Sequence, residues 1–345
     1  MAGDTSGVYR PLPTITVGGQ RRGARGGDRT PTVWRVRVIV VGAGIAGVAC
    51  GRELAGRGVD VRVLERAPAV GGRLAVHRHD GRPADVGAAY FTVSDPDFED
   101  QVARWSTAGS VRPWTDRLAV FRGDRHDGPT TGPMRWAAPG GLRSLVEDLA
   151  RDLDVETGRT VARVGPGPSV DGEPADAVVV AMPDPQAERI VDPSSPAAAA
   201  VAGREWNPVL ALAAGYPRRA WPDLPAAFVN EHPTLALLAD DGARRGDGAP
   251  VLVAHSTGAL ARAHDAAPEG AVPEMADAVA HLLDLPDAPD WTHVHRWRCA
   301  APAASRDERF HLGADGIGLA GDGWGRSRVE AAYLSGLHLA RALTA

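Results

Sequence analysis

The sequence predicts an α/β fold, in which a doubly wound parallel sheet is interrupted by insertions that form an α+β domain. Three observations support this class. A β-branched run at 36–41, a glycine-rich turn, a helix and a second strand form a βαβ unit. An apolar run at 177–181, and a short strand at 318–320 before a long amphipathic helix, supply later pieces of the same sheet. From 193 to 300, short strands alternate with proline-rich turns, which is typical of a separate unit.

The other elements follow from periodicity and from glycine or proline breaks. The first helix ends at a glycine, and the strand after it is rich in valine. The segment from 80 to 135 is rich in Trp, Arg and Asp and has no long helical periodicity. In chain order we expect helices at 48–58, 141–153, 274–283 and 327–343, and strands at 59–64, 160–164, 209–213 and 251–255.

Composition excludes several classes of protein. The 345 residues are 44% hydrophobic and 23% charged, which is an ordinary globular balance with enough length for two domains. No apolar run reaches the roughly 18 residues of a membrane span. The formal charge of −5 predicts no general affinity for nucleic acid or anionic lipid. Cys50 and Cys299 are the only cysteines, so we expect no disulfide framework and a cytoplasmic location.

All 38 basic residues are arginine. The absence of lysine excludes a Schiff-base lysine, a P-loop lysine and a lysine general base. Residues 1–32 have no periodicity, and we expect them to be a disordered extension. The arginine pair at 21–22 is not followed by an apolar stretch, which argues against a twin-arginine export signal.

A complete G-x-G-x-x-G motif lies between the first strand and the first helix. Its glycines allow a tight turn, the approach of a pyrophosphate to the backbone, and close packing of helix on strand. The N–H groups of the helix start bind phosphate oxygens. Glu65 follows Gly47 by 18 residues, at the end of the second strand, where an acid binds ribose hydroxyls. We therefore expect a dinucleotide to bind at Gly42, Ala43, Gly44, Ile45, Ala46, Gly47 and Glu65.

A second glycine pair distinguishes FAD from NAD. Gly71 and Gly72 let another backbone segment lie against the dinucleotide, and Arg73 offers a forked donor to phosphate or to the flavin edge. With this extra G-G-R, the chain resembles the flavin-containing amine oxidase superfamily.

The segment Asp85-Val-Gly-Ala-Ala-Tyr-Phe-Thr92 narrows the match. It resembles the D-x-G-A-Q-Y-F-T segment of the renalase family, with Ala89 in place of the usual glutamine. Gly87 and Ala88 are small enough for backbone to pass close to a flat ring, and Tyr90 is a candidate pocket wall.

The C-terminal motif agrees with this resemblance, which covers about residues 36–343. Gly321-Asp322 and the start of the last helix match the closing motif of the superfamily, in which the aspartate binds the ribityl or phosphate region and the helix start faces the pyrimidine edge. The resemblance implies further cofactor contacts at Arg66, Gly87, Ala88, Ala89, Tyr90, Val161, Met182, Gly321, Asp322, Arg328, Val329 and Ala332.

Two segments of the insertions, 251–256 and 295–298, resemble renalase strands that reach the substrate side of the flavin. They make His255, Trp297 and Arg298, together with Tyr90, the candidate catalytic residues. The resemblance assigns 33–80, 137–192 and 305–345 to an FAD-binding domain, and 81–136 and 193–304 to a substrate domain.

The resemblance implies noncovalent FAD, a small-molecule substrate and O₂. Renalases oxidise 2- and 6-dihydro isomers of NAD(P)H to NAD(P)⁺ by hydride transfer to flavin N5, and O₂ then reoxidises the flavin with release of H₂O₂. An amine oxidase or desaturase acting on a specialised metabolite is the first alternative. A non-catalytic carrier resembling the GDP-dissociation inhibitors is the second. The oligomeric state stays open.

Two histidine pairs are candidate metal ligands. His77-x-His79 and His293-x-His295 each place two imidazoles on one face of a strand, but no other ligand residues accompany them in a known spacing. We expect solvated histidines and no metal.

Overall fold

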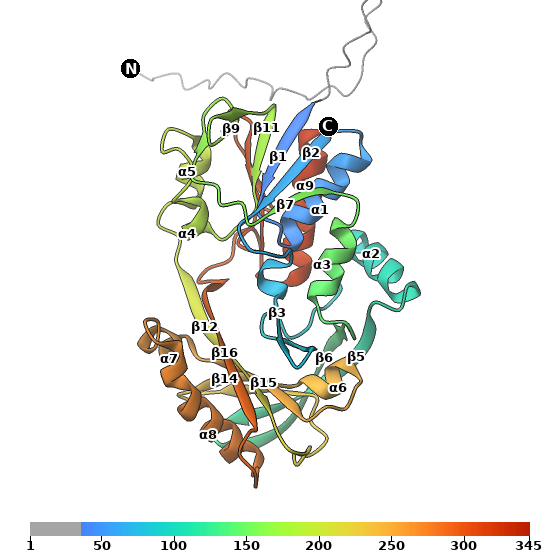
Figure 1. Cartoon of the computed structure of the whole chain (residues 1–345), viewed down its shortest axis with the longest axis vertical. Coiled ribbons are helices and arrows are strands. Elements are labelled where there is room, and N and C mark those ends of the chain that lie inside the picture. The colour runs from blue at the N-terminus through green and yellow to red at the C-terminus, as the bar shows by residue number, and fades with distance from the viewer. Residues whose placement is uncertain (1–35) are drawn as a thin grey trace, which may run out of the picture.

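The computed structural model describes residues 36–345. The extension expected at 1–32 lies outside the described residues. Two large sheets organise the chain, and Figure 1 shows one above the other with a small hairpin between them. The predicted α/β class, with a second unit built of strands and helices, is confirmed.

The upper sheet has six strands in the order β17-β18-β11-β1-β2-β7, all parallel except β17 against β18. Residues Val38–Val40 and Ala177–Val180 are almost fully buried, as expected for central parallel strands that are covered on both faces. The strand bounds are β1 (Arg37–Val41), β2 (Asp60–Glu65), β7 (Asp154–Thr157), β11 (Ala177–Val180), β17 (His311–Leu312) and β18 (Ile317–Leu319).

Helices cover both faces of this sheet. One face carries α1 (Ile45–Gly56), α3 (Arg143–Ala150) and α9 (Val329–Leu343), with α2 (Pro96–Thr107) packed beyond them. Gly336 lets α9 approach α1, because a Cβ there would lie 1.9 Å from the carbonyl oxygen of Ala46. The other face carries α4 (Asp184–Ala187), α5 (Pro196–Val201) and the small sheet of β8 (Val164–Gly165), β9 (Ser169–Val170) and β10 (Glu173–Pro174).

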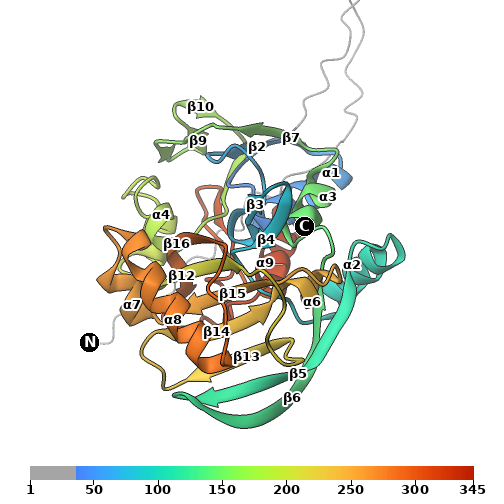
Figure 2. The ribbon, with the colours of Figure 1, turned by 60° about the horizontal axis from the view of Figure 1, so that its bottom comes forward.

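The lower sheet has seven strands in the order β16-β12-β15-β14-β13-β5-β6. It is antiparallel except where β13 meets β5. Figure 2 shows the long β5–β6 hairpin along one edge and α7 and α8 on one side. The strand bounds are β5 (Arg112–Arg122), β6 (Arg125–Ala137), β12 (Trp206–Gly215), β13 (Ala226–Asn230), β14 (Leu235–Asp240), β15 (Val251–Ser256) and β16 (Trp291–Pro302).

The two faces of the lower sheet differ. Leu210, Leu212 and Leu252 pack with the helix pair on one face. Ala211, Ala213 and Val253 point the other way, toward Ala84 and Val86 of the hairpin segment between the sheets. The remaining elements are α6 (Asp241–Arg245), α7 (Gly258–Ala263), η2 (Pro268–Ala271), α8 (Val272–Leu283), η1 (Gly72–Leu74), β3 (Val76–His79) and β4 (Arg82–Asp85).

One predicted strand was wrong, and the elements between 80 and 135 were not predicted. The strand expected at 160–164 reduces to Val164–Gly165, and the sixth strand of the upper sheet is instead β7, whose short polar sequence lacks an apolar run. Between 80 and 135, the chain forms a helix and a long hairpin. The α2 helix has its own start signal, because the Asp95 side chain accepts from the Asp97 N–H (3.1 Å) before Pro96. Phe98, Val102 and Trp105 pack α2 into the core under the upper sheet.

None of the helices formed by residues 36–345 combines the length and the apolar character needed to cross a bilayer.

Candidate cofactor and substrate site

The first glycine loop closes tightly against the upper sheet. Gly42 has φ +105°, and a Cβ on it would lie 2.5 Å from the carbonyl oxygen of Ala181. A Cβ on Gly47 would lie 1.9 Å from the carbonyl oxygen of Gly42. Ala43, Ile45 and Ala46 are buried between them. Both outer glycines are therefore required by the turn itself, whether or not a ligand is present.

Gly44 is different, because it faces open space. Among residues 36–345, no atom outside its chain neighbours lies within 4 Å of an added Cβ, and no side chain caps the start of α1. The N–H groups of the first turn of α1 have no acceptor within the helix. This open helix start fits a phosphate group.

The second glycine pair packs against the first glycine loop. The Gly71 N–H donates to the carbonyl oxygen of Ala43 (2.9 Å), and a Cβ on Gly72 would lie 3.2 Å from the Cα of Gly44. Gly71 and Gly72 both have positive φ. Two backbone segments without side chains therefore border the same open space, as a long dinucleotide requires.

Glu65 orients the loop from the end of β2. Its Oε2 accepts from the Ala43 N–H and its Oε1 from the Ala67 N–H, both at 2.7 Å. Arg66 beside it is exposed, while Val161 is buried in the cluster that contains Leu64. The carboxylate thus lies beside the glycine loop, at the position where the sequence predicts a ribose-binding acid.

Arg73 and Asp322 bind each other. The guanidinium forms two hydrogen bonds to the carboxylate, one of them Nη1–Oδ2 at 2.9 Å, and the Ser327 hydroxyl donates to the same carboxylate. Arg73 also donates to the carbonyl oxygen of Ala300 on β16 (3.0 Å) and lies over the ring of Trp206 on β12. This pair joins the second glycine pair to the C-terminal motif, and the contacts of Arg73 with β16 and β12 join both motifs to the lower sheet.

The segment 87–90 runs from Arg73 toward the lower sheet. A Cβ on Gly87 would lie 2.0 Å from the carbonyl oxygen of Arg73, and the Ala88 N–H donates to that oxygen at 3.0 Å. Ala89 is buried, and its carbonyl oxygen accepts from Arg244 Nη1 (2.7 Å). The glycine at 87 is therefore a packing requirement of this structure.

The start of α9 is held by Glu330. Its carboxylate accepts from the Ser94 N–H and hydroxyl (2.5 and 2.7 Å) and from the Asp95 N–H (2.9 Å). Arg328 precedes the first turn, and Val329 and Ala332 lie in it. Gly321 donates its N–H to the Ser335 hydroxyl (2.9 Å), and the carbonyl oxygen of Met182 lies 3.9 Å from a Cβ added to Gly321. A cavity of about 210 Å³ beside Arg328 and Glu330 borders this helix start.

A row of side chains crosses five strands of the lower sheet on the face opposite α7 and α8. The pairing of β13 with β14, β15, β12 and β16 aligns Phe228, Leu237, His255, Ala211 and His295. We call these five residues the cross-strand row. Trp297 lies two residues beyond His295, and its Nε1 donates to the carbonyl oxygen of Val86 (2.6 Å). The face that carries the row therefore looks toward the upper sheet.

His255 is a neutral side chain in this structure. Burial and the nearby Arg244 both lower its pKa, a hydrogen bond with the Gly87 backbone opposes them, and the resulting pKa is about 4. Its Nε2 is buried without a hydrogen-bond partner among the described residues.

Arg298 does not join Trp297 and His255. Side chains alternate along β16, so Arg298 points to the other face, where its Nε donates to Asp265 at 3.0 Å and its side chain is 62% exposed. The structure thus separates Arg298 from the other candidate catalytic residues. Tyr90, by contrast, lies near the row, with its ring 6.3 Å from that of Trp114 and under the guanidinium of Arg135.

The histidine pairs expected to be solvated instead stack between the two units. The rings of His77 on β3 and His293 on β16 are 3.6 Å apart and nearly parallel, and His79 stacks on Trp291 (4.2 Å). Burial lowers the pKa of His77, His293 and His295. Within residues 36–345, no three His, Cys, Asp or Glu side chains gather closely enough to hold a metal ion.

A buried ionic cluster, not predicted from the sequence, supports this region. Asp241 accepts from Arg82, Arg244 and Arg245, and Asp85 lies 3.2 Å from Arg245 and accepts from the Leu142 N–H (3.0 Å). Burial raises the pKa of Asp85, whereas the surrounding arginines hold the pKa of Asp241 at about 2. The i, i+3 and i+4 spacing of Asp241 with Arg244 and Arg245 was the available sequence signal.

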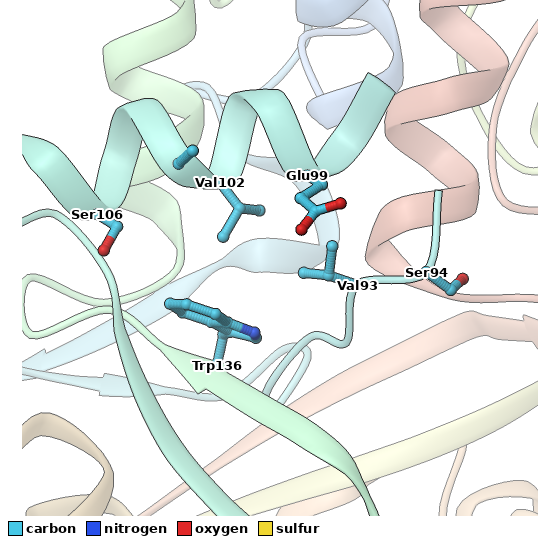
Figure 3. Close-up of a pocket in the computed structure, with 7 residues that line it drawn as sticks. Val93, Ser94, Glu99, Val102, Ser106 and Trp136 are labelled. Carbon is cyan, nitrogen blue, oxygen red and sulfur yellow. The ribbon is translucent and has the colours of Figure 1, made fainter. Parts of the chain in front are cut away.

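A separate groove of about 550 Å³ lies between α2 and the end of β6. Figure 3 shows the ring of Trp136 facing Val102 of the helix, with Glu99 nearby. The Phe91–Trp136 backbone pair directs both rings away from the cross-strand row. This groove contains none of the predicted site residues.

A Rossmann-type sheet, two glycine loops around an open helix start and a facing antiparallel sheet define a dinucleotide-binding protein. Residues 40–105 match the NAD(P)-binding Rossmann-like domain, and residues 117–344 match the flavin containing amine oxidoreductase family. The chain belongs to the flavin containing amine oxidoreductase family. It is an FAD-dependent oxidoreductase, so the non-catalytic alternative is set aside. The renalase family itself is not among these matches.

Individual relatives agree over shorter stretches. The chain is 49% identical to a putative flavin-containing monoamine oxidase of Mycobacterium tuberculosis and 46% identical to a hydroxyneurosporene desaturase of Rubrivivax gelatinosus, each over 57 residues. These stretches are 16% of this chain but only 13% and 11% of those relatives. A putative protoporphyrinogen oxidase from Exiguobacterium has the same fold, with TM-score 0.72, 13% identity, and coverage of 90% of this chain and 98% of that one.

Proposed function

We propose that this oxidoreductase oxidises 2- and 6-dihydro isomers of NAD(P)H to NAD(P)⁺. The substrate would lie between the glycine loops and the cross-strand row, and FAD, when bound, supplies the hydride acceptor. The proposal rests on the renalase-like segments and on one feature of the site, its lack of a strong base.

The lack of a base is the observation that carries the proposal. The chain contains no lysine, and His255, the central polar residue of the cross-strand row, is neutral with a pKa of about 4. An amine is protonated near pH 7 and must lose a proton before it gives up hydride. A dihydropyridine carries no such proton and yields hydride directly, so positioning and electrostatics supply most of the rate.

The residues near the row have positioning roles in this proposal. The ring of Trp297 is fixed by its hydrogen bond to Val86 and presents an aromatic face to the pyridinium product, whose positive charge such a face favours. Tyr90 offers a second aromatic face at the other end. His255 is held neutral, so it does not repel the cationic product. Arg298 has no role, because it lies on the opposite face.

The test is anaerobic mixing of the FAD-loaded protein with borohydride-reduced NAD that contains the 2-, 4- and 6-dihydro isomers. Rapid bleaching of the flavin absorbance by the 2- or 6-isomer, with little effect of ordinary NADH, is expected. Admission of O₂ should then restore the absorbance and release H₂O₂. No bleaching by any isomer would overturn this substrate. Amines and conjugated alkenes, the substrate types of the alternative oxidase or desaturase, would then be tested in the same way.

A further inference from the structure

Arg135 of β6 carries a buried guanidinium that lacks a carboxylate partner within residues 36–345. Among residues 36–345 the buried arginines are Arg135, Arg244 and Arg245, and the last two pair with Asp85 and Asp241. Arg135 is 5% exposed, and its one hydrogen bond to the described residues is a long one, from Nη1 to the carbonyl oxygen of Pro133 at 3.4 Å. Its Nε has no hydrogen-bond partner among the described residues.

Two aromatic rings flank this guanidinium. Its central carbon lies 5.4 Å from the ring centre of Tyr90 and 5.9 Å from that of Phe228. Gly132 leaves room beside it, because a Cβ there would lie 3.3 Å from Nη2. Phe228 is the β13 end of the cross-strand row, so the guanidinium stands at one end of the proposed substrate face.

The backbone directs Arg135 to that face. Phe91 and Trp136 exchange two hydrogen bonds, from the Phe91 N–H (3.3 Å) and from the Trp136 N–H (2.8 Å), which makes a local antiparallel pair. Neighbouring side chains alternate, so Tyr90 and Arg135 point to one side and Phe91 and Trp136 to the other. Phe91 and Trp136 accordingly pack at the core under the upper sheet.

A buried cation without a counterion is unfavourable, and contacts with two aromatic faces offset only part of that cost. An anion from outside the chain would complete the site. The planar fork of arginine suits carboxylate and phosphate oxygens, which it binds at two points. We propose that Arg135 binds an anionic group of the substrate, a carboxylate or a phosphate, between Tyr90 and Phe228. The substrate is then an organic anion rather than a simple cationic amine.

This inference deepens the proposed function and rests on it for the place of the substrate. Dihydronicotinamide dinucleotides carry phosphates, so the two agree. An equilibrium experiment tests Arg135 without turnover. The FAD-loaded protein is titrated with benzoate, phenyl phosphate and the neutral analogue benzamide, by calorimetry and by the shift of the flavin spectrum.

Benzoate or phenyl phosphate is expected to bind at least about tenfold more tightly than benzamide, and their order distinguishes a carboxylate site from a phosphate site. Arg135→Met should abolish the preference, Arg135→Lys should keep part of it, and Arg125→Met, on the exposed end of the same strand, should leave it unchanged. Equal binding of the charged and neutral probes to the unmodified protein would overturn the proposal without any variant.

A binding role and a purely structural role of Arg135 predict different effects of Arg135→Met. Because no carboxylate of the described residues pairs with the buried charge, a binding role predicts that Arg135→Met leaves the Tm unchanged or raises it while the affinity for the anion falls. A lower Tm with an unchanged ratio of benzoate to benzamide affinity would overturn the binding role.

A turnover measurement distinguishes the proposed role of Arg135 from the proposed substrate. Borohydride-reduced nicotinamide riboside lacks the phosphate of the reduced mononucleotide. If the mononucleotide bleaches the flavin at least about tenfold more efficiently, and only when Arg135 is present, both proposals are supported. Equal bleaching by both compounds would overturn the role of Arg135 and leave the proposed function standing. Selective binding of the anionic probes without bleaching by any isomer would support Arg135 and overturn the proposed substrate.

Discussion

Arg73 and Asp322 form a two-point ion pair although they are 249 residues apart in the sequence. Arg73 follows the second glycine pair, and Asp322 precedes the last helix, so their contact closes the upper unit around the open start of α1. The Asp322 side chain is 8% exposed and that of Arg73 is 28% exposed. A pair this well covered loses more when one partner is removed than a surface pair does.

Asp322→Asn should therefore weaken FAD binding. The variant removes the charge opposite Arg73, and with partial exposure we expect a loss of about 2 kcal/mol, or roughly thirtyfold in Kd. Fluorescence titration of the apoprotein with FAD measures it. Asp265→Asn is the matched control, because its pair with Arg298 is exposed and lies on the far face of β16. Equal effects of the two substitutions would show that the pair has no part in holding the cofactor.

Gly44→Ala should prevent FAD binding but leave the fold intact. The backbone of Gly44 is ordinary (φ −73°), and an added Cβ meets no atom within 4 Å, so only a bound dinucleotide would collide with it. Flavin content after purification and Tm are the two measurements. Gly56→Ala, at the other end of α1 and also in open space, should keep full flavin content and raise stability by about 0.5–1 kcal/mol. Yellow Gly44→Ala protein would mean that the dinucleotide takes another path.

His255 should make the protein sensitive to acid. Its folded pKa of about 4 lies below the ordinary value of 6.5, so the unfolded chain binds the proton more readily. Stability from this residue is complete above pH 6.5 and falls as the pH drops toward 4, by up to roughly 3 kcal/mol. His255→Gln cannot be protonated, and its unfolding free energy should fall less steeply over that window. Parallel curves for the two proteins in urea titrations from pH 7 to 4.5 would contradict the prediction.

Asp241→Asn should strongly destabilise the fold. The change leaves Arg82, Arg244 and Arg245 without their shared carboxylate, and removing one partner of a buried charge cluster costs about 3–5 kcal/mol. Asp287→Asn, which removes an exposed pair with Arg218, should cost less than about 1 kcal/mol. Urea unfolding of both variants provides the comparison, and a loss below 1 kcal/mol in Asp241→Asn would show that the cluster does not stabilise the protein.

Local patterns located the cofactor side of the site. The turn at Gly42–Gly47, the acid at Glu65 and the glycine pair at Gly71–Gly72 depend on backbone conformation within a few residues, and the structure brings them together around the start of α1. The substrate side of the site was harder to predict from the sequence. The renalase-like segment 295–298 predicts Arg298 on the substrate side, yet alternation along β16 directs its side chain to the opposite face. No local pattern marked Arg135, because what distinguishes it is a tertiary feature, its burial without a carboxylate partner among the described residues.

The sequence by itself determined the α/β class, the dinucleotide loop and the absence of any lysine chemistry, since each depends on residue types or on short-range backbone geometry. Only the tertiary structure decided which side chains share the substrate face. The cross-strand row joins residues 211, 228, 237, 255 and 295 through strand register, and register depends on which face of each whole strand is buried. The tertiary structure also stacks His77 on His293, buries Arg135 without a carboxylate partner among the described residues, and pairs Arg73 with Asp322. These contacts depend on which distant segments of the chain meet, and no local sequence pattern predicts which segments those are.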